Sequence, residues 1–337
     1  MTPTTPTFTE DLNGIDAIEV DVDRMSIAFE ANGDLSDSVH FLVDPGDHAP
    51  LMRRDGSRIR IEQEGRYDGE GTPVVRVPQR FSLPVAVSIR EGRFSLDRVN
   101  SQVALNLRKG DVAINGGRGD VACNVSRGDI AIVDREGDLA INVRAGDVAL
   151  NRCSGDTSIN INKGDLAVVG GDGAANFSLS KGDVAIVRPD EMALDLDLSK
   201  GDVAISGGSL RLAKVDVVSG DIVAKSRLLY TGEAEPEIDS FEDLIDEETA
   251  EEKSSVHFTL GGIEFFAGDE GVRFSRGGTD IFRAGPEGVE VRRGDGSEVF
   301  VASEGGVGQR PARNKVDQYH FNTQSGDVHL EIPDDQA

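Results

Sequence analysis

The most regular feature of the chain is an alternation of apolar and polar residues that restarts every nine positions. Between successive turns the apolar residues recur at every second position, as in strands with one buried face. Gly-Asp pairs mark the turns and begin at positions 110, 119, 128, 137, 146, 155, 164 and 182, and again at 201 and 220. Such a repeat indicates an architecture of stacked, nearly identical units.

The nine-residue units alternate between two kinds, so the structural period is eighteen residues. One kind carries three alternating apolar positions, such as Val103, Leu105 and Leu107, and the next carries two, such as Val112 and Ile114. A long and a short strand per eighteen residues predict an all-β fold, a parallel β-solenoid with two strands per coil and about 4.8 Å between coils. The preference for right-handed crossovers predicts a right-handed solenoid.

The pattern divides the chain into four segments. Residues 14–82 form an irregular β segment that leads into the solenoid, and residues 83–230 form the solenoid of nonapeptide repeats. Residues 231–255 form an acidic linker, which is either disordered or contains one short amphipathic helix. Residues 256–337 form a small C-terminal β region, whose last strands, within 319–332, resume the solenoid pattern.

The net charge of the chain restricts the classes of molecule that it can bind. The chain has 61 acidic and 35 basic residues, a net charge of −26, which disfavours nucleic acid and anionic membrane surfaces as partners. Acidic residues in excess, with more arginine than lysine, suggest a halophilic, archaeal source. The N-terminal residues lack a basic start followed by an apolar run, so we expect no secretory signal and a cytoplasmic location.

Candidate catalytic chemistry is scarce. The five histidines lack zinc-ligand spacing with Cys, Asp or Glu, and no nucleophile-elbow, Walker or dinucleotide motif occurs. The short turns between repeats leave no loops from which to build a cleft. We therefore expect a non-enzymatic protein without a cofactor or metal. Cys123 occupies an interior position and Cys153 a turn in a different column, so we expect no disulfide.

The Gly-Asp turns place aspartates in columns along the edges of the solenoid. On one edge most of them follow a basic residue by two positions, as in Lys109 and Asp111, Arg127 and Asp129, Lys163 and Asp165, Lys181 and Asp183, and Lys200 and Asp202. This spacing predicts that a basic ladder offsets the acidic one without metal. Specific Ca²⁺ binding is the alternative, although secreted nonapeptide β-rolls arrange their Gly and Asp residues differently.

The outward strand positions carry no charge, which is unusual for solvated sheet faces. On the long-strand face we expect a self-association surface formed by Ala104, Asn106, Ala122, Asn124, Ala140 and Asn142. The short-strand face is also uncharged, with Ala113, Ala131, Ala149, Ala167 and Ala185 in one of its columns. In the alternative interpretation, the C-terminal β region or the acidic linker covers one of these faces within the same chain.

The repeats resemble those of known β-solenoid families. The segments FSLSKGDVAIV, LDLSKGDVAISG, VDVVSGDIVAKS and FNTQSGDVHLEI are similar to the repeat of the putative-adhesin family of bacterial and archaeal solenoids, over 83–230 and 319–332. The chain also resembles bactofilins and the haloarchaeal halofilins, cytoplasmic solenoids that polymerise end to end and influence cell shape. Bactofilin coils are built on units of about six residues and have a triangular cross-section, whereas this chain repeats every nine.

These observations lead to one predicted function and one alternative. We expect a structural protein that self-associates into a cytoskeletal-type polymer or scaffold and affects cell shape. Its partners would be further copies of itself and other cytoskeletal or membrane-associated proteins. The alternative is a cell-surface adhesin-like module or a regulatory binding module.

Overall fold

A computed structural model describes residues 7–35, 37–69 and 71–228, six strands between 256 and 302, and residues 319–325 and 328–331. Within these ranges the secondary structure is strands joined by turns, with no helix. None of the described residues belongs to a helix that could cross a membrane. The acidic linker and its possible helix lie outside the described residues.

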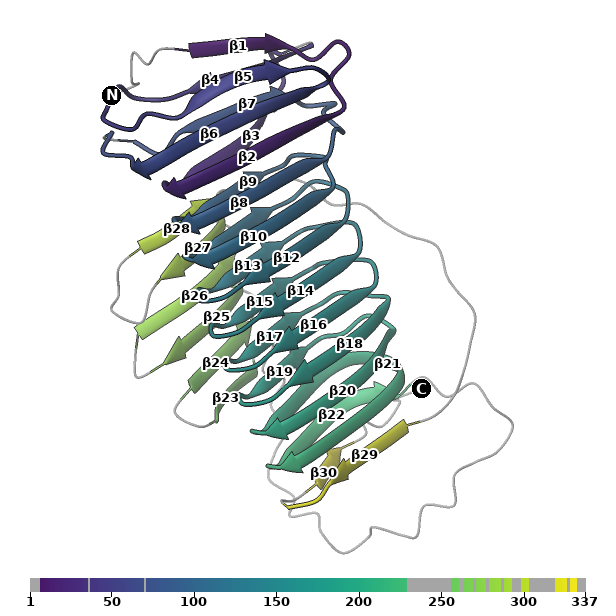
Figure 1. Ribbon diagram of the computed structural model, residues 1–337. Helices are drawn as coiled ribbons and strands as arrows, with labels where there is room; N and C mark the ends of the chain where they lie inside the picture. Colours follow the sequence, from purple (N-terminus) through teal and green to yellow (C-terminus); the bar gives the residue numbers. More distant parts are fainter. Residues whose placement is uncertain are drawn as a thin grey trace, which may run out of the picture.

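The repeat region forms a solenoid with two strands per coil (Figure 1). The long strands are β8 (Val85–Glu91), β10 (Val103–Lys109), β12 (Val121–Val125), β14 (Leu139–Val143), β16 (Thr157–Ile161), β18 (Ala174–Leu179) and β20 (Met192–Lys200). The short strands are β9 (Phe94–Asp97), β11 (Val112–Asn115), β13 (Ile130–Val133), β15 (Val148–Asn151), β17 (Leu166–Val169) and β19 (Val184–Val187). Each strand pairs in parallel with its counterpart one coil away, as Val103 does with Val121. The predicted parallel solenoid and its eighteen-residue register are confirmed.

Near the C-terminal end the coil lengthens by one residue. Val184 pairs with Val203, nineteen positions later, as the wider spacing of the last Gly-Asp pairs indicates. The long strand β21 (Val203–Ser219) serves both stacks of the solenoid. Its first residues pair with β19 and its later residues with β20.

The N-terminal segment adds two coils in an order that differs from the chain order. Strands β2 (Ala17–Arg24) and β3 (Ile27–Asn32) lie directly beside β8 and β9. The later strands β6 (Arg58–Arg66) and β7 (Val74–Pro78) lie outside them. Strands β1 (Thr7–Asp11), β4 (Ser38–Leu42) and β5 (Leu51–Asp55) pair antiparallel, which ends the parallel stack.

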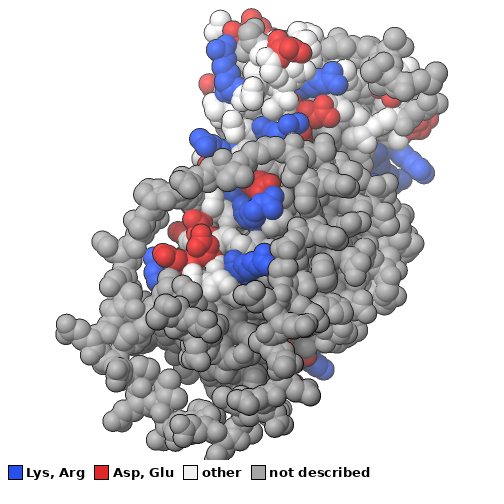
Figure 2. All heavy atoms as spheres, turned by 180° about the vertical axis from the view of Figure 1, so that it is seen from behind, with Lys and Arg blue, Asp and Glu red and all other residues white. Residues whose placement is uncertain are grey.

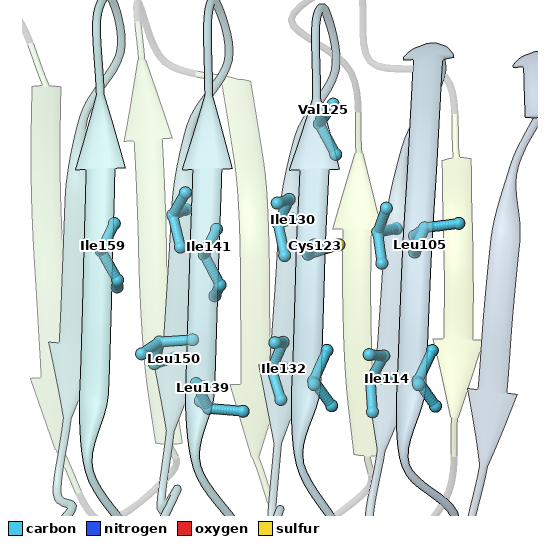
Figure 3. Packing of buried hydrophobic residues seen from close by; sticks show 14 of the residues in the cluster. Leu105, Ile114, Cys123, Val125, Ile130, Ile132, Leu139, Ile141, Leu150 and Ile159 are labelled. Carbon is cyan, nitrogen blue, oxygen red and sulfur yellow. The ribbon is translucent and has the colours of Figure 1, made fainter. Parts of the chain in front are cut away.

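The C-terminal region contributes to two different sheets. Strand β22 (Ile222–Leu228) follows β21, and β29 (Tyr319–Thr323) and β30 (Val328–Glu331) then add a last coil by pairing with β21 and β22. The strands between them form a separate antiparallel meander: β23 (Val256–Leu260), β24 (Ile263–Gly268), β25 (Gly271–Arg276), β26 (Thr279–Gly285), β27 (Gly288–Arg292) and β28 (Glu298–Ala302). Figures 1 and 3 both show this meander behind the short strands.

The core is a narrow file of side chains between the two strand stacks. Leu105, Cys123 and Ile141 follow one another along the long strands, facing Ile114 and Ile132 from the short ones (Figure 3). All five are at most 1% exposed. Because each coil packs only against its neighbours, stability depends on the fit between adjacent coils.

Arg135 is an exception to this apolar interior. Its side chain is fully buried, and its Nη1 donates to the carbonyl oxygens of Val99 (2.8 Å) and Gly116 (3.1 Å). The Nη2 and Nε atoms donate to the carbonyl oxygens of Ser101 (2.5 Å) and Gly119 (3.0 Å). One side chain thus joins the turns of two successive coils.

Both cysteines are buried, which has a direct consequence for their reactivity. Cys123 is 1% and Cys153 7% exposed, and burial raises the pKa of each thiol to about 12. Since the thiolate is the reactive form, we expect no labelling by iodoacetamide at pH 8 in the native protein and labelling of both cysteines in denaturant. Mass spectrometry counts the labels, and fast native labelling of either residue would contradict the burial.

Candidate functional site

The predicted self-association residues lie together on the outer face of the long strands. The alanines Ala104, Ala122 and Ala140 pair in register, and so do Asn106, Asn124 and Asn142. All six are exposed. The Nδ2 atom of Asn142 donates to the Oδ1 atom of Asn124 at 3.1 Å, so part of the asparagine column is ordered by side-chain hydrogen bonds.

The uncharged area extends beyond those six residues. We use the name uncharged window for the two central outward positions on each of six consecutive long strands, which are Ala86, Ser88, Ala104, Asn106, Ala122, Asn124, Ala140, Asn142, Ser158, Asn160, Asn176 and Ser178. Every one of them is exposed, and all are Ala, Asn or Ser. At about 4.8 Å per coil the window runs for about 24 Å along the solenoid.

Charged residues bound the window at both ends of the solenoid axis. Toward the N-terminal coils, Glu19 pairs with Ala86 and Asp21 with Ser88. Toward the C-terminal coils, Asn176 pairs with Asp195. Charge therefore returns in the coils next to the window, as is normal for a solvated sheet face.

The short-strand face is different, because the chain covers it. Its outward residues Ala113, Ala131, Val133 and Val187 are at most 5% exposed. The meander β23–β28 lies on this side of the solenoid (Figures 1 and 3). The alternative in which the C-terminal β region covers one face therefore holds for the short strands, and the long-strand face stays open. Figure 2 shows the molecule from behind, where described basic and acidic side chains intermingle over the N-terminal coils.

One long edge of the window is acidic. Asp120, Asp138 and Asp156 precede their long strands and are exposed, and we call them the acidic row. The backbone N–H of Asp138 donates to Asp120 Oδ1 at 3.1 Å, and that of Asp156 donates to Asp138 Oδ1 at 3.0 Å. These bonds fix the carboxylates at the edge of the face.

At the opposite edge the exposed charged side chains are mainly basic, whereas the aspartates of the same turns are buried or half-buried. The basic row consists of Arg108, Lys109, Arg127, Arg144, Lys163, Lys181 and Lys200, which end the long strands or follow them and are exposed. Lys109 Nζ lies 2.6 Å from Glu91 Oε1, and this hydrogen bond holds the pKa of Glu91 below its usual value. The other cations project from the turns toward solvent.

The aspartates that the basic ladder is predicted to offset also accept hydrogen bonds from the backbone. The described hydrogen bonds to those carboxylates come from the backbone of the next coil, as from Asp129 N–H to Asp111 Oδ1 (3.2 Å) and from Asp183 N–H to Asp165 Oδ1 (2.8 Å). Asp111 and Asp165 are only 7% exposed, whereas Lys163 is exposed. Backbone N–H groups thus contribute to stabilising the acidic ladder, and Arg93 Nε lies 3.7 Å from Asp111 Oδ2. The basic row is more exposed than these aspartates.

The arrangement of these aspartates also concerns the alternative prediction, specific Ca²⁺ binding. In the described part of the chain, no group of three or more His, Cys, Asp or Glu side chains converges as metal ligands would. The Oδ1 atoms of the ladder aspartates accept backbone hydrogen bonds instead, as Asp129 Oδ1 does from Asp147 N–H at 2.9 Å.

A hollow of about 770 Å³ at the N-terminal end of the window is lined by Asp21, Glu62 and Arg108, among others.

Comparison with known proteins gives a family match over part of the chain and weak similarity to solved structures. Residues 69–206 match the model of the family described as Toastrack DUF4097. A solved structure of a putative cell adhesion protein from Clostridium sporogenes is 14% identical with a TM-score of 0.25, and covers 48% of this chain and 100% of its own. A putative adhesin from Parabacteroides distasonis is 15% identical with a TM-score of 0.34, and covers 68% of this chain and 92% of its own. No curated protein matches the chain.

Proposed function

We propose that the protein is a non-enzymatic scaffold that self-associates through the uncharged window. One observation carries the proposal: twelve exposed outward positions lack charge in a chain with 28% charged residues, on the face that the chain leaves open. A sheet face that contacts only solvent normally carries charged side chains, as the neighbouring positions Asp21 and Asp195 do.

The side chains of the window suit contact with a second sheet. Alanine and serine are small enough to let two sheets approach to about 10 Å, the usual spacing of packed sheets. The window contains no ionised group whose desolvation would oppose contact. The asparagine amides retain donors and acceptors that can bond across the interface.

Pairing through one face is the first step toward the proposed cytoskeletal-type scaffold. A polymer needs a second contact, and among the described strands β29 and β30 pair on one side only, with β21 and β22, so their outer edges are the proposed second contact. The two-stranded coil differs from the triangular coil of bactofilins, so the polymer and a role in cell shape are proposed by functional analogy with bactofilins and halofilins, in the cytoplasm of a halophilic archaeon. Other cytoskeletal or membrane-associated proteins would then be further partners.

An adhesin-like binding module is the second candidate function. The resemblance of the repeats to those of the putative-adhesin family, over 83–230 and 319–332, favours it. In that case the uncharged window would bind the surface of another protein, and this chain alone would remain monomeric.

Two glutamates in the window distinguish these candidates. We expect Ala122→Glu with Asn124→Glu to abolish self-association, because two carboxylates would have to be desolvated between the sheets. The monomer should stay folded, with a stability within about 1 kcal/mol of wild type, since both positions are exposed. Light scattering measures the assembly and circular dichroism measures the fold.

A matched control adds the same charge elsewhere. Asn13→Glu with Gln79→Glu places two carboxylates on exposed positions of the N-terminal coils, away from the window, and should assemble like wild type. Normal assembly of the window variant would contradict the proposal. Equal loss in both variants would also contradict it, because net charge alone would then explain the effect.

A further inference from the structure

We infer that two copies pair window to window with their solenoid axes parallel and their long strands antiparallel, so that the acidic row of each meets the basic row of the other. This arrangement rests on the proposed self-association. It follows from the opposite charges of the two long edges of the window. The occupant of the face is therefore a second copy of this chain in one defined orientation.

With the strands of the two sheets aligned, two symmetric ways exist to place one window on another, and both are twofold rotations with the axis between the sheets. An axis parallel to the solenoid reverses the strands and keeps each coil beside the same coil of the partner. An axis parallel to the strands reverses the order of the coils and keeps the strand direction. Only the first brings opposite edges of the window together.

In the first arrangement the charges of each coil match those of the same coil in the partner. Asp138 precedes the long strand β14 and Arg144 follows it. Each of these aspartates would therefore meet the arginine of the same coil in the partner. The coil of Asp156 ends in Lys163 and gives an equivalent pair. The second arrangement would instead place the basic rows of both copies side by side. Like charges juxtaposed in this way select against that orientation.

The remaining two sides of the window do not favour either arrangement. Beyond the N-terminal end Arg60 pairs with Glu19 (3.1 Å), and beyond the C-terminal end Lys214 pairs with Asp195 (3.2 Å), so both ends carry mixed charge. Mixed charges would meet in either orientation. The choice therefore depends on the edges, where the acidic row faces one side and the basic row the other.

The two arrangements differ in which residues meet across the interface. Ser88 and Ser178 lie on the first and last coils of the window, five coil steps apart. In the edge-matched arrangement each serine lies beside its own copy. In the opposite arrangement Ser88 faces Ser178, and two copies of Ser88 lie about 24 Å apart at about 4.8 Å per coil.

Cysteine cross-linking separates these outcomes. Ser88→Cys and Ser178→Cys are prepared separately, one with a mass tag, and treated with a short bismaleimide at about 0.15 M salt, where long-range repulsion is screened beyond about 8 Å. Wild type is the control, because its own cysteines are buried. Each variant alone is expected to shift from the 35.9 kDa band to a dimer, and the mixture to yield only like-with-like dimers.

Cross-linking only between unlike variants would overturn the inferred orientation while leaving the window as the interface. If no sample cross-links and sedimentation shows monomers, the proposed self-association itself fails. Dimers that sediment but do not cross-link in any combination would place the contact away from the window and would also overturn the inference.

Discussion

Replacing Arg135, which lies in the turn between β13 and β14, with methionine is expected to destabilise the solenoid by about 3–5 kcal/mol. Methionine has a similar length but donates no hydrogen bond, so the carbonyl oxygens of Val99, Ser101, Gly116 and Gly119 lose the guanidinium donor. Each buried carbonyl left without a partner costs about 1–3 kcal/mol.

The charge state of Arg135 is consistent with this expectation. Burial lowers its pKa to about 10, so the guanidinium remains protonated near neutral pH. A base whose pKa is lowered on folding opposes folding while it is charged, and the four carbonyl contacts offset that cost. Removing the side chain therefore removes the contacts and leaves the turns of two coils unsupported.

Urea unfolding followed by circular dichroism measures the effect of this substitution. The matched control is Arg152→Met, because Arg152 pairs with Asp134 at the surface with 63% of its side chain exposed. An exposed ion pair contributes at most about 1 kcal/mol. Equal destabilisation by the two substitutions would contradict a structural role for the buried guanidinium.

The second large effect is expected at the glycine turns. Gly128 has a φ of 140°, and a Cβ atom on it would lie 1.6 Å from the carbonyl oxygen of Gly110 in the preceding coil. The backbone has little room to move, because Gly146 is stacked on Gly128 in the same way. We expect Gly128→Ala to cost roughly 4 kcal/mol or more.

Gly56→Ala is the control that separates steric clash from backbone strain. Gly56 also has a positive φ, 61°, but nothing lies within 4 Å of the position of an added Cβ. The left-handed conformation alone should cost about 1–2 kcal/mol. Thermal unfolding measures both variants, and a Gly128→Ala protein as stable as Gly56→Ala would show that the coils can separate to admit a methyl group.

The coil register could be predicted from the sequence because the repeat fixes it. The pairing of Val103 with Val121 follows directly from the eighteen-residue period. The swapped order of β2 and β6 could not be predicted, since their segments share no period that specifies which coil is outermost. Irregular strands of this kind are placed by tertiary packing rather than by local pattern.

Two other features had weak signals in the sequence. Arg135 occupies the repeat position of Gly117, whose missing side chain leaves room for the guanidinium, since a Cβ there would lie 2.8 Å from Arg135 Nη1. The covered face could have been recognised from Val133 and Val187, which are apolar where the long strands carry asparagine or serine. The outward position of the six proposed contact residues could be predicted from the pattern alone, because strand alternation determines which side chains point outward.

Sedimentation velocity of the wild-type chain tests the central claim most directly. Over about 1–100 micromolar, a range suited to a small interface, the sedimentation coefficient should rise from that of a 35.9 kDa monomer toward larger species. In the same range the variant with glutamates at positions 122 and 124 should stay monomeric. A wild-type chain that remains monomeric throughout would contradict self-association and would favour a binding module for another protein.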